Sequence, residues 1–301
     1  MVARRLRWMM VMELAFYIAI GYGLLADGGS IAQALALALG CFLGIRALIV
    51  LTSYGFTFVY RRVNNEKLTP VTVLGWLRMM LDEYLALTLL YSLIMPFQER
   101  VLGPDRLRQS TERPPLLLIH GYQCNRGFWF WLRPRLEAAG WVVATHNLEP
   151  IFADIDSYAD GVAQRVDAVL AATGARRLIL VCHSMGGLAA RAYLRKCGTA
   201  KVERIITLGT PHHGTRIAVL APGRNGAQMR VGNPWLRALA EGALPSGSVS
   251  IYSINDNTVM PQQASSSLEG AKNIAISGVG HLGMATSSQV LVALEEALSA
   301  V

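Results

Sequence analysis

The chain has 301 residues, of which 52% are hydrophobic and only 16% are charged, whereas soluble domains usually carry about a quarter charged residues. This composition excludes an ordinary, wholly soluble protein and indicates that part of the chain lies in lipid. The net charge of +8 is spread evenly, because residues 1–113 carry 12 Lys and Arg against 8 Asp and Glu, and residues 114–301 carry 16 against 12. Without a basic stripe interleaved with aromatic residues, we expect no nucleic-acid partner.

The first two apolar segments predict a pair of membrane helices. Trp8 to Ala26 is apolar except for Glu13, and Ile31 to Leu51 is apolar except for Arg46, so each has about the length that crosses a bilayer. A cleavable signal peptide is disfavoured for the first segment, because no clear small-residue cleavage site follows it and a second span does. The flanking basic residues are Arg4, Arg5 and Arg7 before the pair, and Arg61, Arg62 and Lys67 after it. By the positive-inside rule, both ends of this hairpin lie in the cytoplasm.

A third apolar stretch, Val71 to Phe97, is interrupted by Arg78, Asp82 and Glu83. Arg78 and Asp82 are four residues apart and would face each other on a helix, which lowers the cost of burying them inside a bundle. If this stretch spans the membrane, everything downstream lies outside the cytoplasm, which is the arrangement we favour. If it lies along the interface, everything downstream is cytoplasmic, and the arginines that follow it point that way.

The remainder of the chain divides into a linker and a second domain. Residues 98–113 are polar and contain Gly103 and Pro104, so we predict a linker there, a membrane segment at 1–97, and a domain at 114–301. The domain alternates strands and helices, which indicates a mostly parallel sheet with helices on both faces. The expected strands are 116–119, 141–144, 178–181, 202–208, 249–254 and 273–276, and the expected helices are 128–139, 158–172, 188–194 and 288–298.

Polar residues follow several of these strands directly, at the carboxyl edge where parallel sheets collect reactive groups. Ser184 follows the third strand, Asp256 the fifth and His281 the sixth, in the chain order Ser, Asp, His. Ser184 stands in Cys182-His183-Ser184-Met185-Gly186, which matches the strained G-x-S-x-G turn except for cysteine at the first glycine. For Asp256 and His281, an Asx-turn and a structural histidine are the alternatives.

Residues 114–301 resemble a minimal α/β-hydrolase, most closely the small bacterial lipases of the Bacillus lipase A kind. The resemblance rests on five motifs: Leu118-Ile119-His120-Gly121-Tyr122, the serine turn, Leu208-Gly209-Thr210-Pro211-His212-His213-Gly214, Asp256-Asn257-Thr258-Val259-Met260-Pro261 and Gly278-Val279-Gly280-His281-Leu282-Gly283. The membrane segment lies outside it.

The resemblance implies acyl transfer by a catalytic triad of Ser184, His281 and Asp256. Backbone N–H groups of Tyr122 and Met185 would form the oxyanion hole. We expect no cofactor and no metal, since adjacent histidines such as His212 and His213 point in different directions.

Other residues admit more than one interpretation. His120 and His183 are interpreted as packing histidines and not as the general base. The aromatic run from Phe128 to Trp131 is either a helix packed on the sheet or an apolar mouth for acyl chains. The segment 215–232 is a candidate short flap, and the four cysteines, which have no C-x-x-C spacing, are interpreted as mostly buried thiols.

Together these patterns predict a serine hydrolase in a bacterial inner membrane that cleaves carboxylic esters of lipids, as a lipase, esterase or phospholipase-like enzyme. The substrate would be a lipid or another acyl ester met at the membrane. An acyltransferase or thioesterase with the same triad, and a non-catalytic membrane scaffold with a vestigial hydrolase domain, are the alternatives.

Overall fold

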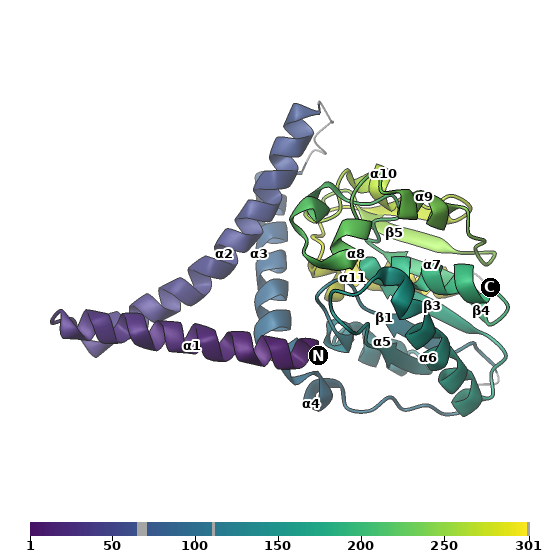
Figure 1. Ribbon diagram of the computed structural model, residues 1–301, viewed down its shortest axis with the longest axis horizontal. Helices are drawn as coiled ribbons and strands as arrows, with labels where there is room; N and C mark the ends of the chain where they lie inside the picture. The colour runs from purple at the N-terminus through teal and green to yellow at the C-terminus, as the bar shows by residue number, and fades with distance from the viewer. Residues whose placement is uncertain (65–70, 110–111, 300–301) are drawn as a thin grey trace.

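The computed structural model describes residues 1–64, 71–109 and 112–299 (Figure 1). Lys67, residues 110–111 of the predicted linker and the last two residues of the predicted domain lie outside these ranges. Long helices at the start of the chain stand to one side of an α/β domain. The helices before the sheet are α1 (Val2–Ala26), α2 (Ile31–Val63), α3 (Val73–Leu89), a π-turn (Leu90–Ile94), a 3₁₀ turn (Met95–Phe97) and α4 (Gln98–Leu102).

Three segments among the described residues are long and apolar enough to cross a membrane by length and composition: Val2–Ala26, Ile31–Val63 and Val73–Leu102. The turn between α1 and α2 lies where the sequence predicted it, because Ser30 accepts a hydrogen bond from the backbone N–H of Gln33 and caps α2. Arg46 of α2 and Glu13 of α1 form an ion pair with a 2.7 Å nitrogen–oxygen distance, which joins the two helices.

Arg78 and Asp82 face each other on α3 as the sequence predicted, but the pair is not buried inside a bundle. The two side chains lie 3.8 Å apart but are 82% and 54% exposed. The reason is the orientation of α3, which turns its next residue, Glu83, inward against the α/β domain and leaves this pair on the open side. Glu83 is therefore the buried charge of this helix.

The α/β domain contains a sheet of six parallel strands in the order β2-β1-β3-β4-β5-β6. The strands are β1 (Leu116–Ile119), β2 (Val143–His146), β3 (Leu178–His183), β4 (Val202–Leu208), β5 (Val249–Ser253) and β6 (Lys272–Ile276). The helices of the domain are α5 (Leu132–Ala138), α6 (Tyr158–Thr173), α7 (Met185–Cys197), α8 (Gly223–Gln228), α9 (Pro234–Ala240), α10 (Gln262–Ser266) and α11 (Ser288–Ser299). The predicted fold class is confirmed.

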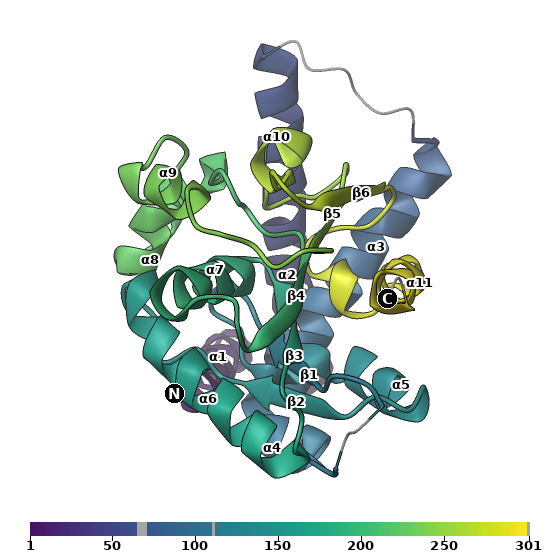
Figure 2. The same cartoon turned by 90° about the vertical axis from the view of Figure 1, so that its right-hand side faces the viewer.

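Alternate residues of each strand point to opposite faces and build two apolar cores. Leu116 and Leu118 pack on one face with α5 and α11, whereas Leu117 and Ile119 pack on the other face with α6 and α7. Figure 2 shows these two pairs of helices on either side of the sheet. Both faces are covered, which explains why the central strands are apolar without alternation.

Several predicted element boundaries differ from the structure, and two of the differences have a clear physical reason. The single helix expected at 128–139 is a 3₁₀ turn (Arg126–Trp129) followed by α5, because the ring of Pro134 conflicts with a helical carbonyl at Phe130. The second strand is β2 at 143–146 and not 141–144, since pairing with β1 begins at Val143 opposite Leu116.

The segment predicted as a linker packs closely on the domain. Residues 98–102 form α4, and Asp105 is buried against three arginines at distances of 2.5–3.5 Å: Arg126, Arg133 and Arg165. Its carboxylate also accepts the backbone N–H of Thr145 at 2.8 Å. A polar composition predicted a solvated connection here, whereas this carboxylate anchors the segment.

Candidate active site

Ser184 stands on the turn between β3 and α7 in a backbone conformation that side-chain-bearing residues rarely adopt, with φ 53° and ψ −127°. Its N–H donates to the carbonyl of Leu208 at 2.9 Å, and its own carbonyl accepts the hydroxyl of Thr210 at 2.9 Å. These bonds to the end of β4 hold the strained residue in place.

Close approach of the neighbouring chain explains two of the glycines around the turn. A Cβ on Gly186 would lie 2.5 Å from the carbonyl oxygens of Ile119 and His120, at the end of β1. A Cβ on Gly121 would lie 2.8 Å from the Cβ of Ser184. The loop after β1 is thus packed directly against the serine.

The structure brings Ser184, His281 and Asp256 together at one edge of the sheet. His281 Nε2 lies 3.0 Å from Ser184 Oγ, and His281 Nδ1 lies 2.7 Å from Asp256 Oδ2. Asp256 also accepts the backbone N–H groups of Thr258 and Val259 at 2.7 and 2.8 Å. All three side chains are buried. The order hydroxyl, imidazole, carboxylate is the arrangement that can relay a proton.

Electrostatics at this site favour the charged form of the histidine. Burial lowers the pKa of His281, but the Asp256 carboxylate, by its charge and its hydrogen bond, and the Glu83 carboxylate outweigh it, so the pKa lies above its usual value of 6.5. The environment is therefore suited to stabilising an imidazolium that forms during a reaction.

Tyr122 and Met185, the expected oxyanion-hole residues, flank the serine on the β1 loop and at the start of α7. Among the described residues, neither backbone N–H donates to a protein acceptor. Tyr122 is held by its side chain, whose hydroxyl donates to the carbonyl of Pro222 at 2.6 Å. That bond joins the β1 loop to the predicted flap, which forms a 3₁₀ turn (Arg216–Leu220) and α8.

The other histidines are buried or lie apart from the serine hydroxyl. His183 stacks on Phe128 with ring centroids 4.0 Å apart, and burial lowers its pKa well below 6.5. The ring of His120 joins Gly121 O to the N–H of Leu148, and burial lowers its pKa to about 3. His212 is enclosed with Arg191 and Thr207, whereas His213 is exposed.

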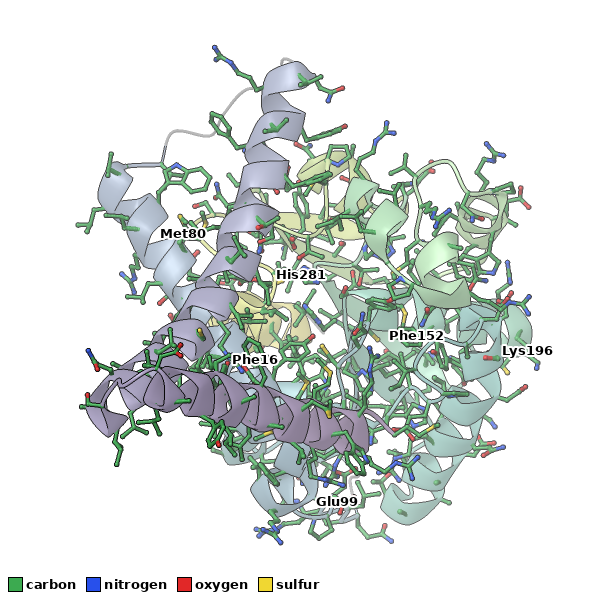
Figure 3. The ribbon with its side chains drawn as sticks, turned by 60° about the vertical axis from the view of Figure 1, so that its left-hand side comes forward. Phe16, Met80, Glu99, Phe152, Lys196 and His281 are labelled. Atoms are coloured by element: carbon green, nitrogen blue, oxygen red, sulfur yellow. The ribbon has the colours of Figure 1, made fainter. Side chains whose placement is uncertain are left out.

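A cavity of about 250 Å³ opens beside Ser184 and His281, and one of its walls comes from the N-terminal helices. The helix residues are Ile49, Val50 and Ser53 of α2, Glu83 and Leu87 of α3, and Tyr91 of the π-turn. Figure 3 shows His281 on the side of the domain that faces these helices, with Lys196 at the far edge. The sequence analysis did not find this wall.

The structure also bears on the sequence-based interpretations of the aromatic run and of the cysteines. Phe128 and Trp129 are fully buried in the core on the face of the sheet that α5 and α11 cover. Packing on the sheet therefore accounts for these two residues, and they do not line an opening for acyl chains. Of the cysteines, Cys124 and Cys182 are buried, but Cys197 is exposed. Glu83 carried a usable signal, because it is an acid in an apolar segment whose neighbour Asp82 already has Arg78 as a partner.

Known proteins resemble parts of this chain. A family model described as palmitoyl protein thioesterase matches residues 115–241. Triacylglycerol lipases of Pseudarthrobacter phenanthrenivorans and Burkholderia plantarii are each 33% identical over 117 residues, which is 36% of this chain and 36% and 32% of theirs. The chain thus spans about a third of the length of these curated relatives.

Solved structures share the fold of the domain. The mature form of a Bacillus licheniformis lipase superposes with a TM-score of 0.56 at 19% sequence identity. The superposition includes 63% of this chain and 94% of the lipase chain. Aspergillus fumigatus lipase B has a TM-score of 0.52 at 21% identity, over 57% of this chain and 49% of its own. The α/β domain therefore has the α/β-hydrolase fold.

Proposed function

We propose that this protein is a membrane-anchored serine hydrolase that cleaves carboxylic esters of lipids through an acyl-enzyme. The observation that carries the proposal is the buried chain from Ser184 Oγ through the imidazole of His281 to the carboxylate of Asp256, with distances of 3.0 and 2.7 Å. The partial matches to triacylglycerol lipases point to the same class of substrate.

In the first half of the reaction, Ser184 Oγ attacks the ester carbonyl while His281 Nε2 takes its proton. Asp256 holds Nδ1–H and stabilises the imidazolium. The tetrahedral intermediate then collapses, the C–O bond to the alcohol breaks, and His281 donates its proton to the leaving oxygen. Water, deprotonated by His281, hydrolyses the acyl-serine in the second half.

The backbone N–H groups of Tyr122 and Met185 receive the negative charge that develops on the carbonyl oxygen. Both are without protein acceptors among the described residues, so they are available to a ligand. Loss of one such donor costs on the order of a hundredfold in rate.

Lipid as the substrate is supported by the position of the cavity. Ile49, Val50 and Leu87 line it, while their helices carry large apolar side chains such as Leu48 and Leu85 that are more than half exposed. An acyl chain from the bilayer would therefore enter this cavity beside Ser184 along its apolar helix wall.

For the placement in a bacterial inner membrane, the arrangement of the helices favours α3 along the interface. Both ends of the α1–α2 hairpin contact the domain, through Met1 with Glu149 and Arg61 with Ile254, and Glu83 in the middle of α3 does as well. Figure 2 shows α1 end-on while α3 runs across the view. With α1 and α2 crossing the bilayer, α3 and the domain share the side of the hairpin ends, which the charge rule assigns to the cytoplasm.

This placement differs from the periplasmic one favoured by the sequence, and protease accessibility distinguishes them. Protease added to intact spheroplasts is expected to leave the domain uncut, and the same protease added to inverted vesicles is expected to cleave it. Cleavage in spheroplasts would instead place the domain in the periplasm.

Fluorophosphonate labelling tests the hydrolase itself. We expect the full-length protein in detergent micelles to be labelled at Ser184, and Ser184→Ala and His281→Ala to lose labelling. Ser246→Ala and His213→Ala, at exposed positions, are the matched controls and should label like the wild type. A folded wild-type protein that takes no label would favour the non-catalytic scaffold.

The match to the palmitoyl protein thioesterase model favours one second candidate, an acyl thioesterase with the same triad. Turnover of a long-chain acyl thioester and of the corresponding oxygen ester by the same preparation separates the two. A kcat/KM at least tenfold higher for the thioester would select the thioesterase.

A further inference from the structure

We propose that Glu83 of α3 is a positioning residue for His281, so that the helices before the domain complete its active site. The proposal rests on the proposed function, because it assigns His281 the role of general base. Its basis is the contact between this buried carboxylate and the loop that carries the histidine.

The Glu83 carboxylate binds the backbone immediately after His281. Glu83 Oε1 accepts the N–H of Leu282 at 3.0 Å, and Oε2 accepts the N–H of Gly283 at 2.8 Å. The side chain is only 2% exposed. Two hydrogen bonds to a charged acceptor in a buried site are strong and directional, so they fix where the histidine loop lies.

Gly280, on the other side of the histidine, is shaped to the same carboxylate. Its φ is not in the left-handed region, so glycine is not required there for backbone conformation. A Cβ at this position would lie 2.5 Å from the hydroxyl of Tyr54 and would overlap the Glu83 carboxylate. The loop from 280 to 283 therefore wraps around Glu83.

A second contact joins α2 to the same loops. Ser53 Oγ accepts a hydrogen bond from the side-chain amide of Asn257 at 2.8 Å, and Asn257 Oδ1 accepts the backbone N–H of His281 at 2.9 Å. The loop after β5 that carries Asp256 (the acid loop) and the loop after β6 that carries His281 (the histidine loop) are thus both connected to the helices by polar bonds.

Glu83 also contributes charge. The groups that face the His281 ring are the Asp256 and Glu83 carboxylates, the neutral ring of His183 and the hydroxyl of Ser184, and Tyr54 adds a buried hydroxyl beside Glu83. No lysine or arginine among the described residues pairs with Glu83. In its ionised form, Glu83 favours the imidazolium, in addition to the charge of Asp256.

The test compares Glu83→Gln with Asp82→Asn in the full-length protein in micelles, using a soluble short-chain ester over a range of pH. Asp82 is the adjacent acid on the same helix and is 54% exposed, so its variant removes the same charge without the contact. We expect Glu83→Gln to lower kcat about tenfold to a hundredfold, since a misplacement of about 1 Å costs about a hundredfold, with KM changed less than threefold.

The pH profile separates positioning of the base from support of the fold. Removal of the negative charge lowers the pKa of His281, so neutral imidazole persists to lower pH and the acid limb of kcat/KM moves to lower pH in Glu83→Gln. Glu83→Asp, which keeps the charge on a shorter arm, should lose rate but retain the wild-type limb. Asp82→Asn should match the wild type in both.

The proposal would be overturned if Glu83→Gln kept both the kcat and the acid limb of the wild type. It would also be overturned if kcat fell while the acid limb of kcat/KM stayed at the wild-type pH. If Glu83→Gln does not fold, Gly280→Ala breaks the contact from the other side and must lower kcat. Labelling of Ser184 in the wild type keeps the two proposals distinct. Absence of labelling contradicts the proposed hydrolase. Labelling of the wild type combined with wild-type kinetics in Glu83→Gln contradicts only the positioning role of Glu83.

Discussion

The α/β domain and the N-terminal helices treat apolar side chains in opposite ways. Leu180 in the middle of β3 is fully buried, whereas Leu48 in the middle of α2 is 65% exposed, although both stand in uninterrupted apolar sequence. Water drives the first inward. In the proposed membrane location of α2, the second needs no burial, because lipid tails are as apolar as leucine.

Polar bonds join the helices to the loops around Ser184, in addition to an apolar contact in which Leu90 and Met95 pack into the core of the domain. Glu83, Ser53 and Arg61 each bond to loops at the catalytic edge of the sheet. Where apolar contact does not discriminate between positions, directional bonds with few geometric solutions do. In the proposed mechanism, the sheet therefore supplies the reacting groups, and the helices bind two of the loops that carry them.

The largest expected effect is the loss of kcat when Asp256, the domain residue that binds His281, is replaced. Asp256→Asn should lower kcat about 10⁴-fold, because the amide cannot hold the imidazole in the required tautomer or stabilise its charge. Steady-state hydrolysis in micelles measures it. Asp167→Asn, an exposed aspartate paired with Lys201, is the control and should change kcat less than twofold. A loss no larger than that of Glu83→Gln would mean that helix and sheet contribute equally.

Two leucine variants test the comparison directly. Leu180→Ala removes buried methyl groups and leaves a cavity, so the free energy of unfolding should fall by about 2–5 kcal/mol. Leu48→Ala should change it by less than about 0.5 kcal/mol, the range of surface substitutions. Thermal unfolding of both variants in the same micelles measures the difference. Equal shifts would show that α2 packs in a core of its own.

The sequence predicted the sheet, and the residues that the structure brings together at its edge, from local signatures. The central strands are short apolar runs. Ser184 directly follows β3, and Asp256 and His281 lie in the loops that follow β5 and β6, so the parallel topology gathers all three at one edge. The serine, histidine and acid stay a catalytic prediction until labelling and kinetics test them.

The helix wall of the cavity could not be predicted in the same way. Glu83 and Gly283 are 200 residues apart, and their contact depends on which face α3 turns to the domain. The sequence offered two faces, one with Arg78 and Asp82 and one with Glu83, and i,i+4 pairing drew attention to the wrong one. Tertiary docking, and not local periodicity, decides such a choice.

The next effect in size is a loss of stability when the hydrogen bonds between α2 and the acid loop are removed. Arg61 donates to the carbonyl of Ile254 at 2.6 Å and to the side chain of Gln262 at 2.9 Å, and Gln262 in turn donates to the carbonyl of Asp256 at 2.7 Å. Arg61→Met leaves buried acceptors without these donors and should cost about 1–3 kcal/mol of unfolding free energy. Arg62→Met, on the exposed face, is the control. Equal melting temperatures for the two would show that this joint does not hold the domain.

The smallest effect lies inside the helical hairpin, where Arg46 pairs with Glu13 and also donates to Ser92 Oγ at 3.1 Å. In lipid, an unpaired charge is costly, but the separated helices find other partners, so interhelical polar pairs contribute only about 0.6–2 kcal/mol. A double-mutant cycle of Glu13→Gln and Arg46→Met, read from thermal unfolding in micelles, should give a coupling energy in that range. Because neither Glu13 nor Arg46 lines the cavity beside Ser184, fluorophosphonate labelling should stay at the wild-type rate in all three variants. A coupling near zero would mean that apolar packing alone joins α1 to α2. Slower labelling would mean that the Glu13–Arg46 pair also affects the position of the loops around Ser184.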